Sequence, residues 1–64
     1  MITNKMNRAW EILEKGKISP AVRFKLLRAY NTMCNVVNFK PQEDITYETA
    51  NFNDWLKVAE RELK

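Results

Sequence analysis

Apolar residues recur along most of this chain with the spacing of an α-helix. In the first segment, Met6, Ala9, Trp10 and Leu13 follow one another at intervals that place them on a single helix face. Gly16 comes next, at a position where helices commonly end in a left-handed residue. The pattern therefore predicts a first helix over about residues 4–15 that ends just before Gly16.

A second apolar stripe begins after a strong start signal. Ser19 can cap a helix, and Pro20 suits the first helical position because its φ is fixed and it has no N–H to leave unpaired. Pro41 forbids continuation and disfavours a helical conformation at the residue before it. These signals predict a helix over residues 20–39. Its buried stripe would comprise Val22, Leu26, Ala29, Tyr30, Met33 and Val37.

A third stripe follows a polar connection. Asn51 and Asp54 form a variant of the capping box, although the helix could begin anywhere between Thr46 and Asn51. We expect a helix over about residues 49–63, and its buried stripe would comprise Phe52, Trp55, Leu56, Ala59 and Leu63. Three amphipathic helices with short connections predict an all-α, compact three-helix bundle that forms one domain over residues 1–64.

An α+β fold is the alternative. The second half of the middle segment contains poor helix formers, and residues 36–39 could pair with residues 45–47 instead. That pairing would make a short hairpin at about residues 36–48. A two-stranded ribbon of this kind is stable only if it packs against the helices.

Composition limits how such a small chain can be stabilised. Cys34 is the single cysteine and histidine is absent, so neither an internal disulfide nor a usual Cys/His zinc site can form. Stability must come from packing, and we expect Trp10, Trp55 and Leu26 to lie close together in one core.

Catalytic chemistry is poorly represented. Ser19 is the only serine and is explained as a helix cap, while Cys34 lies among apolar neighbours that would not activate a thiol. The acidic cluster of Glu43, Asp44 and Glu48 lacks the spacing and glycine of a calcium loop. We therefore predict a chain that is not an enzyme and that binds no cofactor or metal.

Charge is distributed unevenly. Residues 1–42 hold eight Lys and Arg against two acids, whereas residues 43–64 hold three against six. Either the two halves attract each other within the fold, or a basic face meets an acidic partner. The lone cysteine and the absence of a signal peptide predict a cytoplasmic protein, and no apolar run is long enough for a membrane span.

The most informative surface is the side of the second helix opposite its apolar stripe. At about 100° per residue, one arc of roughly 100° carries asparagines, one cation and two apolar residues, with no acid. Its members are Phe24, Leu27, Arg28, Asn31, Asn35 and Asn38. A routine solvent face would carry Lys and Glu, and exposed apolar residues reduce solubility unless something covers them. Core packing of Phe24 and Leu27 is the alternative explanation.

Two functions fit this surface. The first is a protein-interaction module that docks on a larger, acidic protein; small helical proteins of this class often act as inhibitors, adaptors or regulators, including those encoded by phages and mobile elements. The second is a helix-turn-helix that binds DNA or RNA through Arg23, Lys25, Arg28 and Asn31. Against this function, the turn at residues 16–19 lies later after Ala9 than the motif would place it. A hairpin at residues 36–48 would supply a wing and would favour nucleic-acid binding. Either function is compatible with a homo-oligomer.

Overall fold

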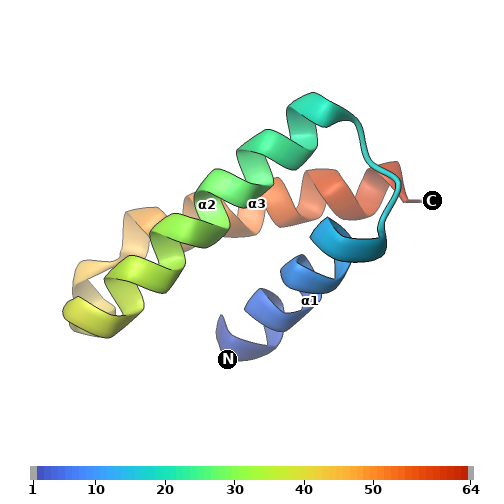
Figure 1. Cartoon of the computed structure of the whole chain (residues 1–64). Helices are drawn as coiled ribbons and strands as arrows, with labels where there is room; N and C mark the ends of the chain where they lie inside the picture. The colour runs from blue at the N-terminus through green and yellow to red at the C-terminus, as the bar shows by residue number, and fades with distance from the viewer. Residues whose placement is uncertain (1, 64) are drawn as a thin grey trace.

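The computed structural model describes residues 2–63, and it is an all-α bundle of three helices (Figure 1). The elements are α1 (Ile2–Lys15), α2 (Pro20–Phe39), a short 3₁₀ helix η1 (Gln42–Asp44) and α3 (Thr46–Glu62). Consecutive helices run in opposite directions. The three-helix bundle predicted from the apolar spacing is therefore confirmed. No helix among residues 2–63 combines the length and hydrophobicity of a membrane span.

The start of α2 follows the local signals. The Ser19 hydroxyl accepts a hydrogen bond from the Val22 N–H at 3.4 Å, and Pro20 occupies the first turn. Gly16, in contrast, does not have the left-handed backbone that we predicted, because no glycine has a positive φ. Its role is steric instead. A Cβ atom at Gly16 would lie 2.7 Å from the carbonyl oxygen of Ile12 and 3.2 Å from the Leu63 side chain.

The connection between α2 and α3 excludes the hairpin. Residues 36–39 continue α2, and Lys40 then turns to extended backbone with φ −128° and ψ 145°, as expected before Pro41. The chain passes through η1 and returns directly into α3, so Tyr47 is helical. No strand is present in residues 2–63, and the predicted alternative hairpin at residues 36–48 is wrong.

Helix α3 starts at the early end of the predicted range of Thr46 to Asn51. The helix begins at Thr46 rather than at about residue 49, and Asn51 lies inside it, so the Asn51/Asp54 capping box does not form. Ile45 occupies the cap position without a side-chain hydrogen bond, and its own side chain is buried in the core. Burial of Ile45 therefore fixes the start of α3, where a polar cap was expected.

The core lies where the three helices face one another. Leu26 is fully buried, as predicted, and Phe52, Ile12 and Met33 are the other large side chains with almost no exposed surface. Six further buried residues complete the contact between the helices. They are Ala9, Val22, Ala29, Ile45, Leu56 and Ala59.

Trp10 does not join this core. Its side chain is 48% exposed, so the predicted cluster of Trp10, Trp55 and Leu26 is wrong. The buried stripe of α1 instead runs through Ala9 and Ile12, which leaves Trp10 at its edge. There the indole packs against Tyr30 of α2, with ring centroids 5.7 Å apart. Trp55 is only partly buried, against the outside of the core.

The bundle is uneven along its length. Helix α1 has 14 residues and α2 has 20, so α1 is shorter by about 9 Å at 1.5 Å per residue. Figure 1 shows the end of α2 and the start of α3 extending past α1. Phe39 and Tyr47 lie in this region and are 83% and 81% exposed. Val37, which was predicted to be buried, is 41% exposed there.

Candidate partner-binding surface

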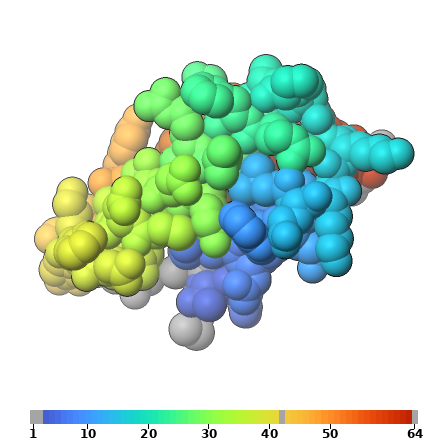
Figure 2. Space-filling view, in the orientation of Figure 1, coloured from blue at the N-terminus to red at the C-terminus, as the bar shows by residue number. Residues whose placement is uncertain are grey.

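The six residues proposed for partner binding lie together on the exposed side of α2. We call this set the outer face: Phe24, Leu27, Arg28, Asn31, Asn35 and Asn38. Figure 2 views the molecule from this side, with α2 crossing the front from residue 20 to residue 39. Phe24 is 55% exposed and Leu27 is 39% exposed. Core packing, the alternative explanation for these two residues, is therefore excluded.

An aromatic ring and a cation are paired on the outer face. The guanidinium carbon of Arg28 lies 5.7 Å from the centroid of the Phe24 ring, one helical turn away. A cation over a ring at this distance is attracted by the negative charge on the ring face. The two side chains therefore hold each other in place while both remain exposed to solvent.

The asparagines of the outer face differ in whether their side-chain amides are free to form hydrogen bonds with a partner. The Asn38 side-chain amide donates a hydrogen bond to the carbonyl oxygen of Cys34 at 2.9 Å. Within residues 2–63, neither Asn31 nor Asn35 makes a side-chain hydrogen bond, and both side chains are exposed. Their amide groups can therefore both donate to and accept from a partner.

An aromatic pair borders the outer face on the side of α1. Tyr30 lies three residues after Leu27, so its side chain is a neighbour of Leu27 on the helix surface, and Trp10 packs on it. Burial, and secondarily the neighbouring Cys34, raises the pKa of the Tyr30 phenol above its ordinary value. The exposed part of Trp10 extends the apolar surface beyond the six predicted residues.

The residues proposed for nucleic-acid binding are not brought together. The Arg23 guanidinium donates to the carbonyl oxygens of Leu13 and Gly16, the latter at 2.7 Å, so it caps the end of α1. Lys25 lies two positions later and therefore projects from nearly the opposite side of α2. Only Arg28 and Asn31 of that set belong to the outer face.

Lys25 and Arg28 instead border a depression between α2 and α3. It has a volume of about 310 Å³, and its other walls come from Ala29, Thr32, Asn51 and Trp55. None of these lining residues is acidic. The depression therefore combines two cations with one aromatic ring on the side of α2 away from Arg23.

Acidic and basic residues neutralise each other only in part. Lys40 and Glu48 form an ion pair at 3.7 Å that joins the basic and acidic halves of the chain, while Arg8 and Glu11 pair within α1 at 3.1 Å. These are the ion pairs among residues 2–63. Helix α2 contains no acid, and neither Lys25 nor Arg28 forms an ion pair with another element among the described residues.

Known proteins provide no further guide. No protein-family model, curated protein or solved structure matches this chain. The described part of the chain also brings together no group of three or more Cys, Asp or Glu side chains that could hold a metal ion.

Proposed function

We propose that this chain is a small protein-interaction module that binds an acidic partner protein through the outer face of α2. The observation that carries the proposal is the exposed Phe24–Arg28 pair on a helix without acids. Aromatic residues and arginine are the types most enriched among residues that dominate binding energy at interfaces. Asn31 and Asn35 would supply hydrogen bonds beside this anchor.

The composition of α2 supports an acidic partner. Arg28 and Lys25 lie on or beside the outer face, and α2 offers no carboxylate to neutralise them. Complementary charge speeds encounter and excludes basic competitors more than it adds affinity. Apolar contact with Phe24 and Leu27 would supply most of the affinity, in the manner of an inhibitor, adaptor or regulator. We further propose a cytoplasmic location, which is supported by the free Cys34 thiol.

The decisive experiment compares single variants against the captured partner. Partners are captured from a lysate of the source organism after nuclease treatment, and their binding to the purified wild-type chain is then measured. Phe24→Lys and Asn31→Glu should each remain folded and weaken binding at least about tenfold, the loss expected when an interface anchor is removed. Tyr47→Lys is the matched control, because Tyr47 is an exposed aromatic residue on α3. Folded variants of Phe24 and Asn31 that bind as tightly as the wild type would overturn the proposal.

Nucleic-acid binding is the second candidate, and one observation favours it. Lys25 and Arg28 flank the exposed edge of Trp55, and a cation beside an aromatic ring suits a phosphate next to a stacked base. Against it, Arg23 is engaged by α1 and no hairpin wing is present in residues 2–63. Binding of this kind should weaken steeply as salt rises, and Lys25→Glu should abolish it. A chain that fails to bind single- or double-stranded DNA or RNA at low salt excludes this candidate.

A further inference from the structure

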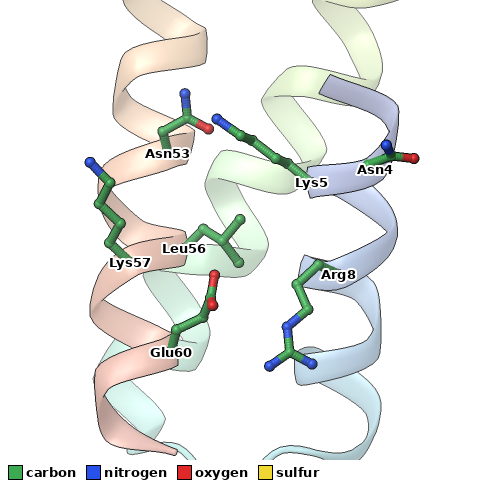
Figure 3. A pocket seen from close by; sticks show the side chains of 7 residues that line it. All are labelled: Asn4, Lys5, Arg8, Asn53, Leu56, Lys57 and Glu60. Atoms are coloured by element: carbon green, nitrogen blue, oxygen red, sulfur yellow. The ribbon is translucent and has the colours of Figure 1, made fainter. Parts of the chain in front are cut away.

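A groove between α1 and α3 lies on the side of the bundle away from the outer face of α2. Figure 3 shows it with α2 behind: Lys5 and Arg8 project from α1, and Asn53, Leu56 and Glu60 project from α3. Its volume is about 250 Å³. Pockets for drug-sized ligands measure about 300–1,000 Å³, so this groove is sized for one small group.

Asn53 provides the first constraint. Its side-chain oxygen Oδ1 has less than 1 Å² of accessible surface and no hydrogen-bond partner within the described structure. A buried acceptor without a donor destabilises the fold, because the acceptor has given up water and received nothing in exchange. Figure 3 shows the Asn53 amide at the groove with its oxygen on the side of α1. This oxygen has almost no surface open to solvent, so a ligand N–H or O–H reaches it when the Lys5 side chain, which Figure 3 shows crossing the groove beside the amide, moves aside.

Lys5 provides the second constraint. It makes no ion pair within residues 2–63, and Figure 3 shows its side chain extending across the groove toward Asn53. The other cations are less available: Arg8 pairs with Glu11 at 3.1 Å, and Lys57 projects from the side of α3 away from α1. The unpaired positive charge beside the buried Asn53 oxygen therefore belongs to Lys5.

Leu56 provides the third constraint. Its largely buried side chain points into the groove below Asn53, and it offers apolar contact to anything that enters. Glu60 follows one helical turn later, on the side of Arg8 rather than of Lys5. Leu56 would therefore separate an anion near Lys5 from the carboxylate of Glu60.

We propose that this groove binds the C-terminal residue of a partner polypeptide whose last side chain is apolar. Such a residue carries the three required groups on adjacent atoms: a backbone N–H for Asn53 Oδ1, a terminal carboxylate for Lys5, and an apolar side chain for Leu56. Capture of a terminal carboxylate is a recurring mode of peptide recognition. The proposal goes beyond binding through α2 and does not depend on it. Because the two surfaces face opposite ways, both can be occupied at once.

The test uses the full chain and a defined probe. The isotope-labelled protein is titrated with acetyl-alanyl-alanyl-leucine, and amide chemical shifts are followed by NMR. We expect saturable shifts at the Asn53 side-chain amide and at the backbones of Lys5 and Leu56. The same peptide with an amidated C-terminus should bind at least about tenfold more weakly, because it lacks the charge that Lys5 pairs with.

Two variants and two controls complete the test. Lys5→Met and Asn53→Leu should each reduce affinity for the free-acid peptide at least about tenfold, while Lys17→Met, at an exposed lysine outside the groove, should leave it unchanged. Octanoate has the carboxylate and the apolar chain but no N–H, so it should bind more weakly than the peptide. The proposal is overturned if no saturable shift occurs at millimolar peptide. It is equally overturned if the amidated peptide, or octanoate, binds as tightly as the peptide with a free C-terminal carboxylate.

Discussion

The carboxylate of Glu62, at the end of α3, accepts two hydrogen bonds from Ser19, at the start of α2. The Ser19 backbone N–H donates at 2.7 Å, and the Ser19 hydroxyl donates at 3.2 Å. The same hydroxyl accepts from the Val22 N–H, so one serine both caps its own helix and binds the last turn of another. A negative charge at a helix N-terminus also interacts favourably with the helix dipole.

Replacing Glu62 should therefore loosen the contact between α2 and α3. We expect Glu62→Ala to lower the free energy of unfolding by about 0.5–1.5 kcal/mol, which is the usual contribution of an intramolecular hydrogen bond to stability. Urea denaturation followed by circular dichroism measures this change. Glu14→Ala is the control, because Glu14 is an exposed glutamate without a hydrogen bond or ion pair in residues 2–63. Equal losses from the two variants would contradict a specific role for Glu62.

Two adjacent leucines of α2 should differ strongly in how much their replacement by alanine lowers stability. Leu26 is fully buried, so Leu26→Ala should lower the free energy of unfolding by about 2–5 kcal/mol, which is enough to unfold a small domain. Leu27 belongs to the exposed outer face, and Leu27→Ala should change stability by no more than about 0.5–1 kcal/mol. Thermal denaturation of both variants checks the register of the helix. A Leu27 variant that is as unstable as the Leu26 variant would place the outer face in the core.

Gly16 should reject any side chain, whatever its backbone preference. A Cβ atom there would meet the backbone oxygen of Ile12, which cannot move without disturbing the end of α1. We expect Gly16→Ala and Gly16→Asn each to lower the free energy of unfolding by about 1–3 kcal/mol, as overpacking does. Asparagine tolerates the left-handed conformation better than alanine does. If the Cβ clash is the cause, both variants are destabilised; if a left-handed backbone is the cause, Gly16→Asn is tolerated and Gly16→Ala is not. A well-tolerated Gly16→Asn would restore the left-handed explanation.

Asn53 should be replaceable at a gain in stability. Its side-chain oxygen is buried without a donor, and leucine has a similar size without that oxygen. We expect Asn53→Leu to raise the free energy of unfolding by about 1 kcal/mol, because it removes an unsatisfied polar atom. Chemical denaturation measures the change, with the exposed Asn51→Leu as the control. A loss of stability in Asn53→Leu would mean that another group already satisfies the oxygen.

Local signals in the sequence predicted the helices where a cap or a proline acts within a few residues. The limits of α2 follow from Ser19, Pro20 and Pro41, which act through their own backbone and side chains. The start of α3 could not be found in this way. It depends on the burial of Ile45, and that burial exists only once the three helices have packed.

The same distinction separates the two candidate surfaces. The outer face could be predicted because its residues lie on one helix, so a fixed angle per residue determines which side chains adjoin. The groove could not be predicted, because Lys5 and Asn53 come together only through the approach of α1 to α3. Trp10 was misplaced for a related reason. Trp10 and Ile12 lie on either side of Ala9 around the helix, and only the packing of the helices decides that Ile12 is buried while Trp10 lies against Tyr30 at the edge of the core.

The short length of α1 has a consequence for how the bundle opens. The end of α2, near Phe39 and Tyr47, is covered by α3 alone. The first half of α2, around Leu26, is covered by both α1 and α3. Opening the first region exposes little apolar surface, while opening the second disrupts the whole core. Backbone amides should therefore exchange with solvent deuterium fastest near Phe39 and slowest near Leu26. Under mild denaturing conditions the chain would fray from the α2–α3 connection inward, while Ser19 and Glu62 still hold the opposite end together.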